Sequence, residues 1–394
     1  MKILSVNAGS SSLKFTLFEM PAGEELISGT FERIGINNSF YSIKLNGEKI
    51  KKEVELDNHK TAVKYLIDEL LTNKIIVSLE ELEGIGHRVV NGGEYNKSII
   101  IDDEFLNVFP NYFELAPLHN PVNMVGIEAF KEYLPNTLMT AVFDTSFHQT
   151  MKKTEYLYAT PYEWYENYGV RKYGYHGTSH RYVDLTIREH LGQNDLKVIT
   201  CHLGNGSSIT AINSKGEVVD TSMGFTPLAG LIMGTRTGDI DASIIPYIMK
   251  KENKTVDEVM NDLNKKSGFL GISGVSSDSR DIENGAEEGN ELCDLTQKMA
   301  ARRVANYVAM YNNLLEGSDV ICFTAGIGEN SALTRQMVID NLKSLGVKID
   351  PQLNDVRGKF RKISTEDSKI MVYIVPTNEE LMIAKDTYEL VTKE

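Results

Sequence analysis

The sequence predicts an α/β protein made of two domains that repeat one plan. At 394 residues the chain is longer than a single hydrophobic core usually supports. Near the start of each half of the chain, two runs of strand-forming residues are joined by a Gly/Ser turn, at residues 3–18 and 198–212. Further strand-like runs alternate with amphipathic helical patterns in both halves. These observations indicate a duplicated α/β domain, with a boundary near residues 146–155.

The composition restricts the possible partners and compartments. The formal net charge of −14 disfavours nucleic acid and anionic membranes as partners. No apolar run approaches the ~20 residues that a membrane span needs, and the first residues become polar too early for a signal peptide. The cysteines are odd in number and lack metal-ligand spacing, so they read as reduced thiols. We therefore expect a cytoplasmic protein, in which anionic substrates meet locally concentrated cations.

The opening hairpin is the first candidate for a binding site. Strand-forming runs at residues 3–6 and 13–18 flank Gly9 and a run of serines. Such small residues leave backbone N–H groups uncovered, so a phosphate could approach closely. The same pattern is typical of an ordinary hairpin turn. A near echo, H-L-G-N-G-S-S at residues 202–208, favours a phosphate-contacting hairpin in each domain.

The rest of the first half alternates strands, helices and turns. Residues 29–56 read as strands, and residues 59–73 as a helix with apolar side chains at i+4 spacing. Two prolines in residues 115–123 predict a rigid loop. Arg88, followed by a glycine pair, is either a surface charge or an anion clamp. Asp144, where a strand gives way to a loop, is either a ligand or a turn residue.

The second half opens with Y-G-Y-H-G-T-S-H, which leads into a helix that Thr178 or Ser179 can cap. His176 and His180 have the spacing of a zinc-binding pair, but the glutamate of an H-E-x-x-H motif is missing. We therefore expect His176 to project into a cleft rather than to bind a metal.

Loops of the second half carry further candidates. Residues 224–241 lack any helical or strand period and form a shaped loop, in which Arg236 is a candidate for stabilising a phosphate. Residues 272–281 also read as a loop. A strand, a glycine turn at residues 326–328 and a following helix form a potential nucleotide site.

Helical patterns dominate the remainder of the chain. Residues 294–316 predict a long amphipathic helix that Asp294 and Gln297 begin as a capping box. The last helix, residues 379–390, follows a strand. Glu379 in its first turn suits the helix dipole and is also a candidate metal ligand.

Taken together, these features indicate phosphoryl transfer in a cleft. The chain lacks a Walker A lysine loop, the H-R-D and D-F-G motifs of protein kinases and a G-x-S-x-G nucleophile elbow. It offers glycine turns beside strands, arginines in shaped loops and acids at strand ends, which suit positioning and charge neutralisation. A nucleotide-dependent phosphotransferase is the first interpretation. A nucleotide-gated binding protein of the chaperone or actin kind is the alternative.

Nine motifs, taken in order, resemble those of the acetate kinases. They are N-A-G-S-S-S-L-K, H-R-V-V-N-G-G, L-H-N-P, F-D-T-S-F-H, Y-G-Y-H-G-T-S-H, H-L-G-N-G-S-S, G-T-R-T-G-D-I-D, T-A-G-I-G-E-N-S and P-T-N-E-E. The resemblance implies duplicated actin-like (ribonuclease H-like) ATPase domains with an interdomain active-site cleft. Residues 1–146 with 381–394 would form one lobe, and residues 147–380 the other, which would carry most of the nucleotide site. The family also implies a homodimer that uses ATP with Mg²⁺, or Mn²⁺, to phosphorylate acetate reversibly, giving acetyl phosphate and ADP.

The same resemblance implies a role for each matching residue. The implied metal ligands are Asn7 and Glu379. The implied catalytic residues are Arg88, which also binds the acetate carboxylate, and Asp144, His176 and Arg236. The pocket for the methyl group would be lined by Val90, Leu118, Tyr175 and Pro227. Contacts with ATP would come from Lys14, His202, Leu203, Gly204, Asn205, Gly206, Asp278, Ser279, Arg280, Gly326, Ile327, Gly328, Glu329 and Asn330.

The chemistry of the reaction changes what we expect of Asp144 and Tyr175. Acetate is ionised at neutral pH, as a Glu side chain with a pKa of ~4.3 is, so no general base is required. We therefore expect Asp144 to order metal-bound water or to orient Arg88. Tyr175 stands where the family commonly has phenylalanine and adds a hydroxyl near the methyl pocket. Propionate or butyrate thus stays an alternative acceptor, and a non-catalytic nucleotide-binding regulator is a third hypothesis.

Overall fold

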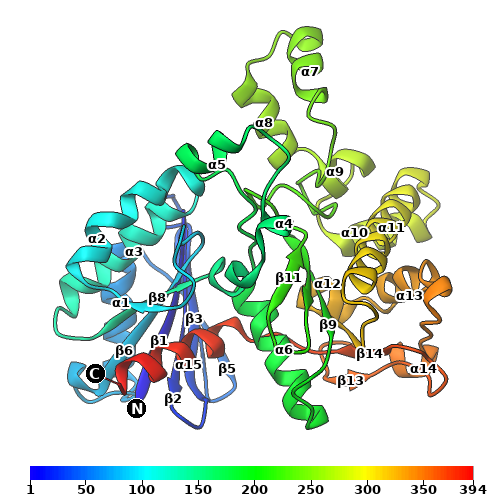
Figure 1. Cartoon of the computed structure of the whole chain (residues 1–394). Coiled ribbons are helices and arrows are strands. Elements are labelled where there is room, and N and C mark those ends of the chain that lie inside the picture. The colour runs from blue at the N-terminus through cyan, green and yellow to red at the C-terminus, as the bar shows by residue number, and fades with distance from the viewer. Residues whose placement is uncertain (394) are drawn as a thin grey trace. The chain divides into compact units, whose positions relative to one another are not determined.

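The computed structural model describes residues 1–393 and divides into two compact units. Unit 1 comprises Met1–Phe147 together with Asn378–Glu394, and unit 2 comprises His148–Thr377. Each unit is an α/β domain with its own mixed sheet. The C-terminal helix α15 (Glu379–Val391) returns to the strands of unit 1, as the red ribbon against the blue strands shows (Figure 1).

The sheet of unit 1 has the strand order β5-β4-β3-β2-β1-β6-β8-β7. Its antiparallel part consists of β1 (Lys2–Gly9), β2 (Ser12–Glu19), β3 (Glu24–Glu32), β4 (Phe40–Leu45) and β5 (Glu48–Glu53). On the other side of β1 lie the parallel strands β6 (Leu82–Val89) and β8 (Met139–Phe143), with the short antiparallel β7 (Ile99–Ile100) at the edge.

Both faces of this sheet are covered, because alternate side chains of a strand point to opposite faces. Leu4 and Val6 of β1 belong to the core that contains residues of α1 (His59–Thr72) and α3 (Asn120–Tyr133). Ile3 packs instead in the cluster of Ala384 from α15. α15 lies so close to β6 that a Cβ on Gly86 would come within 2.3 Å of Thr387 Oγ1.

The sheet of unit 2 has the strand order β11-β10-β9-β12-β14-β13. Its strands are β9 (Val198–Leu203), β10 (Ser207–Ile212), β11 (Val218–Thr221), β12 (Val320–Thr324), β13 (Arg361–Lys362) and β14 (Met371–Ile374). An antiparallel meander is again followed by two strands parallel to the first, β9, as β6 and β8 are to β1. The predicted duplicated α/β fold is confirmed.

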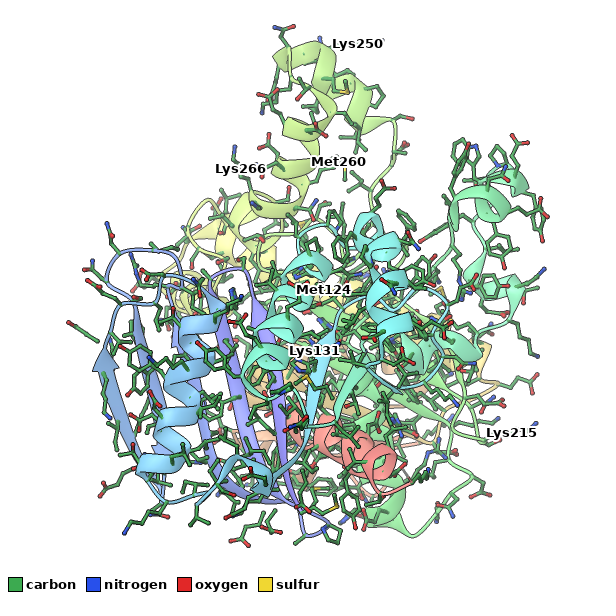
Figure 2. All side chains as sticks on the ribbon, turned by 90° about the vertical axis from the view of Figure 1, so that its left-hand side faces the viewer. Met124, Lys131, Lys215, Lys250, Met260 and Lys266 are labelled. Carbon is green, nitrogen blue, oxygen red and sulfur yellow. The ribbon has the colours of Figure 1, made fainter. Side chains whose placement is uncertain are left out.

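The longest helix of unit 2, α11 (Glu291–Leu314), packs with α13 (Ala332–Asp340) on the sheet. By contrast, α7 (Ile244–Glu252) and α8 (Val256–Lys265) extend away from that sheet, as Lys250, Met260 and Lys266 show (Figures 1 and 2). The other helices are α2 (Asp103–Val108), α4 (Lys153–Tyr156), α5 (Tyr162–Tyr168), α6 (Gly177–Leu191), α9 (Gly268–Ser273), α10 (Ser279–Glu287), α12 (Ala325–Asn330), α14 (Pro351–Asn354) and the 3₁₀ helices η1 (Leu79–Glu81), η2 (Phe109–Leu115), η3 (Ser146–Thr150) and η4 (Lys343–Leu345). Within residues 1–393, no helix is both long and apolar enough to cross a membrane.

Several predicted element boundaries are wrong, each for a local reason. α11 begins three residues before the predicted cap, because the Asn290 side chain accepts hydrogen bonds from the first turn. α3 begins inside the predicted rigid loop, since a proline in the first helical turn needs no hydrogen-bond partner for its nitrogen. α6 begins at Gly177, with His176 in the left-handed region at φ 59° instead of a capping hydroxyl.

Helices also occupy two segments that read as turns or loops. The glycine turn at residues 326–328 lies within α12, and a short helix and the start of another, α9 and α10, enter residues 272–281. The long shaped loop over residues 224–241 is confirmed, since it contains neither helix nor strand.

Candidate active site

The carboxyl ends of three parallel strands gather polar residues in unit 1. Val6 of β1 pairs with His87 of β6, and Arg88 pairs with Val142 of β8. Asn7, Arg88 and Asp144 therefore follow one another across the same edge of the sheet. This edge is where open α/β sheets bind ligands.

Arg88 and Asp144 form a bidentate ion pair at this edge. Nε and Nη2 of Arg88 donate to the two carboxylate oxygens of Asp144 at 2.9 and 2.6 Å. Asp144 is 1% exposed, so the pair is shielded from water on the carboxylate side. Burial alone would lower the pKa of Arg88, but the charge of Asp144 raises it above its ordinary value. Asp144 thus fixes the plane of a guanidinium that stays charged.

The first turn of α15 adds two glutamates to this region, and β2 adds a lysine. Asn378 caps the helix by accepting from Leu381 N at 2.9 Å, and Glu379 is the first helical residue. Glu380 pairs with Lys14 of β2, which stands opposite Asn7 in the hairpin register. The structure therefore brings Lys14 to a carboxylate, and the sequence analysis had not selected Glu380.

Glu379 has the features of a cation ligand. Its Oε1 is buried and has no hydrogen-bond partner among residues 1–393. Burial raises the pKa of Glu379; Arg88 opposes this rise, and Asp144 and Glu380 add to it by repulsion. A divalent cation would reduce the repulsion between these carboxylates and stabilise the charge on the buried oxygen. Mg²⁺ binds through one or two carboxylates and other oxygen ligands. The oxygen ligands at this edge fit such an ion, although no group of three or more His, Cys, Asp or Glu side chains in the described chain is arranged to hold a metal.

In unit 2, a histidine and an arginine converge on the second hairpin. A Cβ on Gly206 would lie 3.3 Å from His176 Cε1 and 3.5 Å from Arg236 Nη1. The His176 ring stacks on His202 with centroids 4.2 Å apart. Burial lowers the pKa of Arg236, yet an arginine stays protonated at neutral pH. The structure thus brings together His176, Arg236 and the predicted phosphate-contacting segment.

Hydroxyl groups fix the histidines beneath this segment. Ser208 Oγ lies 3.2 Å from His176 Nδ1 and 2.6 Å from His180 Nε2. Ser179 Oγ lies 2.7 Å from His202 Nδ1. Burial, with the neighbouring histidines, lowers the pKa of His180 well below its ordinary value, so this histidine is neutral. Both ring nitrogens of His180 bond to hydroxyl groups, those of Thr200 and Ser208, so this side chain supports the residues beneath the segment.

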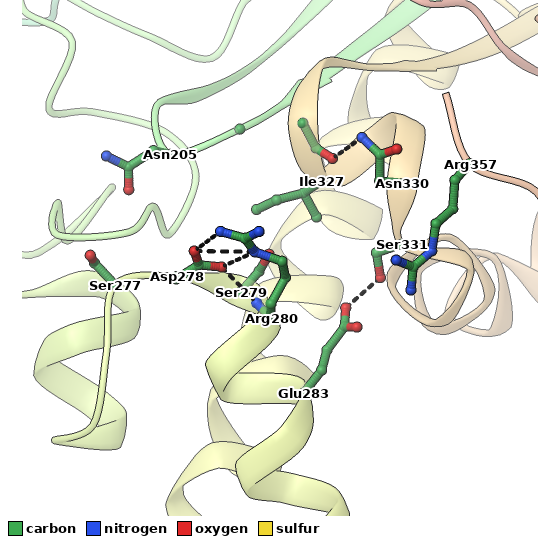
Figure 3. A pocket seen from close by; sticks show the side chains of 12 residues that line it. Asn205, Ser277, Asp278, Ser279, Arg280, Glu283, Ile327, Asn330, Ser331 and Arg357 are labelled. Atoms are coloured by element: carbon green, nitrogen blue, oxygen red, sulfur yellow. Dashed lines mark hydrogen bonds and ion pairs between the residues drawn. The ribbon is translucent and has the colours of Figure 1, made fainter. Parts of the chain in front are cut away.

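A cavity of about 580 Å³ adjoins the hairpin in unit 2 (Figure 3). Its lining includes the predicted residues Gly204, Asn205, Asp278, Ser279, Arg280, Gly326, Ile327 and Asn330, and it adds Ser277, Glu283, Ser331 and Arg357. The volume lies in the range of pockets for small molecules and cofactors. The cavity reaches the hairpin at Gly204 and Asn205, next to Gly206.

One wall of this cavity is a paired arginine. Arg280 and Asp278 form an ion pair at the start of α10, and the Arg280 hydrogen bonds lower the pKa of Asp278 to about 2. Opposite them, Arg357 extends toward the cavity beside Ser331, whose hydroxyl bonds to Glu283 (Figure 3). No motif singles out Arg357 or Glu283, because each is an isolated charged residue in the sequence.

Glu329, predicted among the ATP contacts, bonds to protein backbone. Its Oε1 accepts from Ala325 N at 2.7 Å and from Thr377 N at 3.1 Å. Ala325 has a positive φ of 63°, so this hydrogen bond holds a strained turn in place. The adjacent Gly328 carbonyl accepts from the fully buried Arg335 at 2.9 Å.

The residues predicted for the methyl pocket lie in both units. In unit 1, Val90 is buried and Leu118 is exposed. The Val90 N–H donates to Asn123 Oδ1 at 3.1 Å, and Asn123 Nδ2 donates to Ala8 O at 3.1 Å. Asn123, which the sequence analysis passed over, therefore joins the loop after β6 to β1. The signal was an asparagine in the L-H-N-P-V-N segment.

In unit 2, Tyr175 and Pro227 are linked through the backbone of the long loop. The Tyr175 hydroxyl donates to Phe225 O at 2.7 Å, and Pro227 O accepts from Arg236 Nη1 at 3.4 Å. The hydroxyl that distinguishes Tyr175 from phenylalanine thus contacts the protein itself.

Comparison with known proteins shows which family has this combination of fold and residues. The model of the acetokinase family matches residues 2–385. The chain belongs to the acetokinase family. This membership confirms the prediction that it is an enzyme, a phosphotransferase whose acceptor is a carboxyl group, with ATP or ADP as a substrate.

Relatives of this family match over nearly the whole chain. The acetate kinase of Geobacillus sp. (strain WCH70) is 54% identical and covers 99% of this chain and 98% of its own. Among solved structures, the Porphyromonas gingivalis acetate kinase is 43% identical, with a TM-score of 0.94 and 99% of both chains covered. A propionate kinase from Francisella tularensis subsp. tularensis SCHU S4 is 42% identical, with the same TM-score and coverage.

Proposed function

We propose that this member of the acetokinase family is an acetate kinase, which transfers the terminal phosphoryl group of ATP directly and reversibly to acetate. The observation that carries the proposal is the cavity of about 580 Å³ that ends at Gly204 and Asn205. Beyond that end, His176 and Arg236 flank Gly206. A nucleotide in the cavity would direct its phosphates toward the Arg236 guanidinium and the His176 ring. The acetate kinase of Geobacillus sp. (strain WCH70), at 54% identity, supports acetate as the acceptor.

In the proposed reaction, one carboxylate oxygen of acetate attacks the terminal phosphorus of ATP. The bond from that phosphorus to the bridging oxygen breaks, and its electrons leave with ADP. Positioning and charge neutralisation dominate the catalysis of such transfers. Arg88 would bind the acetate carboxylate in a plane set by Asp144. His176 and Arg236 would stabilise the planar phosphoryl group.

Asp144 needs no part in proton transfer. Acetate enters as an anion at neutral pH, so it has no proton to lose before attack. Both oxygens of Asp144 already accept from Arg88. Of the two roles expected for Asp144, orienting Arg88 is the one that this contact supports.

We include Mg²⁺ in the proposal, with Mn²⁺ as a possible substitute. Asn7 and Glu379 would hold it, because Glu379 Oε1 is a buried carboxylate oxygen without a partner in the described chain. When bound, the ion would neutralise phosphate charge. The chain itself contributes the oxygen ligands. The Asn378 side chain, by accepting from Leu381 N, holds the first turn of α15 that carries Glu379.

Propionate and butyrate are the alternative acceptors. The propionate kinase of similar structure keeps this alternative open. One methylene group changes binding in an apolar pocket by only ~1–3 kcal/mol, so we expect activity with more than one acid.

The homodimer that the family implies is also part of the proposal. α7 buries no residue, and Ile244, Tyr247 and Val256 of α7 and α8 are exposed. Light scattering is expected to give twice the chain mass, and Tyr247→Asp is expected to lower it. A monomeric wild-type protein would contradict this part.

The decisive experiment is hydroxylamine trapping of acyl phosphate, with ATP, Mg²⁺ and acetate, propionate or butyrate in parallel. We expect product with acetate and a smaller yield with the longer acids. Omission of Mg²⁺ should abolish product, and Mn²⁺ should restore part of it. No product with any acid would contradict the enzyme and support a nucleotide-binding regulator; equal or greater product with propionate would contradict acetate as the preferred acceptor.

A further inference from the structure

Two tyrosine hydroxyls hold the backbone of one residue, Phe225, in the long loop of unit 2. The Phe225 N–H donates to Tyr158 Oη at 2.8 Å. The Tyr175 hydroxyl donates to the Phe225 carbonyl at 2.7 Å. The amide nitrogen and the carbonyl of Phe225 are therefore both tied to side chains that lie far from this residue in the sequence. We call this arrangement the tyrosine clamp.

The two tyrosines are held differently: Tyr175 is buried, whereas Tyr158 is 37% exposed and is held through its backbone neighbour and its hydroxyl. Tyr175 is 1% exposed, so its ring is fixed by packing. Leu157, the neighbour of Tyr158, forms an antiparallel bridge with Arg171. The Tyr158 hydroxyl lies so close to the loop that a Cβ on Gly224 would come within 2.2 Å of it. An ordinary tyrosine pKa is about 10, and burial raises the pKa of Tyr158 further, so this hydroxyl is protonated at neutral pH.

The clamp is connected to both groups that flank Gly206. Tyr175 directly precedes His176. Two residues after Phe225, the Pro227 carbonyl accepts from Arg236 Nη1 at 3.4 Å. A shift of the Phe225 backbone would therefore move the Pro227 carbonyl, to which Arg236 donates. It would also move Tyr175, which is joined covalently to His176. A displacement of the loop would change the separation of these two side chains.

We propose that Tyr158 and Tyr175 are positioning residues for phosphoryl transfer: their hydroxyls fix the Phe225 peptide and thereby hold Arg236 in register with His176. This inference rests on the proposed function, and it adds Tyr158, which no sequence motif selected. It also gives the unusual hydroxyl of Tyr175 a role in the loop.

The loop has other anchors, which remain when the hydroxyls are removed. Tyr173 N and Gly174 N donate to Gly224 O at 3.1 and 3.3 Å. A change of tyrosine to phenylalanine keeps the ring and its packing and deletes one hydrogen bond. The phenylalanine variants therefore test the clamp without removing the fold of the loop.

The experiment compares Tyr158→Phe, Tyr175→Phe and the double variant with Tyr173→Phe as the matched control. The Tyr173 hydroxyl donates to Gly169 O at 2.9 Å, outside the loop. At saturating acetate and Mg²⁺, we expect kcat to fall roughly tenfold in each clamp variant, the scale that small misplacement of catalytic groups produces. The KM for ATP should change less than twofold, because the nucleotide cavity is untouched. The double variant should lose little more than either single one, since both hydroxyls hold the backbone of the same residue, Phe225.

A second readout does not depend on activity. Hydrogen exchange of the peptide covering residues 222–230 should become faster in both clamp variants and stay unchanged in Tyr173→Phe. Unchanged exchange would overturn the clamp itself. Faster exchange with kcat within twofold of wild type would overturn its role in positioning. A wild-type protein that forms no acyl phosphate would contradict the proposed function, and with it the catalytic role of the clamp, whereas exchange would still show whether the hydroxyls hold the loop.

Discussion

The two hairpins occupy equivalent places in the two sheets, yet their surroundings differ in charge. Beside β1–β2, ion pairs predominate: Lys14 with Glu380, and Arg88 with Asp144. Beside β9–β10, hydroxyl groups bond to histidine rings, as in Ser179 with His202. Arg236, the cation of this second region, forms no ion pair within residues 1–393. One fold therefore supports two different electrostatic environments.

This difference has a direct chemical consequence. A guanidinium that already has a carboxylate partner can be held in a fixed plane and offers its remaining N–H groups to a small carboxylate. A guanidinium without such a partner keeps its full charge for a phosphate. The carboxylates of unit 1 suit a divalent cation, and the unpaired arginine and hydrogen-bond donors of unit 2 suit a polyanion. Substitutions that remove individual charges or contacts from one unit, with controls that leave the site intact, test this comparison.

The largest effect is expected for Arg236→Ala. Because no carboxylate neutralises Arg236, its charge is free to stabilise the transferring phosphoryl group, and kcat should fall roughly 10³-fold or more, as when an arginine finger is lost. The matched control is Arg280→Ala, whose guanidinium is paired with Asp278 and 82% exposed. That variant should mainly raise the KM for ATP, by less than tenfold. Steady-state kinetics that give a kcat loss under tenfold for Arg236→Ala would place it away from the reacting phosphorus.

Glu379→Gln should weaken the apparent affinity for Mg²⁺ by roughly 100-fold, the upper end of the effects that altered metal-site neighbours produce. Removal of a buried, unpartnered charge should leave thermal stability equal or higher. The control is Glu380→Gln, since Glu380 is already paired with Lys14. Activity is titrated with Mg²⁺ and unfolding is followed without it. Equal metal dependence in both variants would refute the distinction between the two glutamates.

Asp144→Asn should raise the KM for acetate by about 30- to 100-fold, which corresponds to ~2–3 kcal/mol, the lower end of the cost of losing one partner of a buried charge pair. The shape of the pH–rate profile should not change between pH 6 and 9, because acetate is ionised throughout. A deficit that disappears at high pH would assign Asp144 to proton transfer. Recovery at high Mg²⁺ would assign it to metal-bound water instead of Arg88.

The smallest effect concerns packing within each unit. Gly86→Ala places a Cβ 2.6 Å from Ile383 Cγ2 and should destabilise unit 1 by about 1–3 kcal/mol, as overpacking does. Gly326→Ala is the control in unit 2, where a Cβ meets no atom within 4 Å. Urea unfolding should show a lower midpoint for the first variant only. Equal midpoints would mean that α15 can move away from β6 at little cost.

Local patterns predicted much of this molecule. Both hairpins, the helix over α1, the long loop around Arg236 and the first turn of α15 follow from residue types and their spacing. The boundaries of α3 and α11 were wrong, because a proline and an asparagine at a helix start act through hydrogen bonds that a pattern of apolar residues does not reveal. The motifs also selected Arg88, Asp144, His176 and Arg236 as candidates.

The sequence by itself determined the α/β class, the duplication and the family, since these depend on periodicity and on motifs within short segments. Only the tertiary structure decided which candidates touch. Arg88 and Asp144 meet because β6 and β8 are neighbours in the sheet, and Glu379 joins them because α15 packs on the same unit. The tyrosine clamp likewise joins residues from separate segments through single hydroxyl groups. Such contacts depend on strand order and burial, which no local pattern encodes.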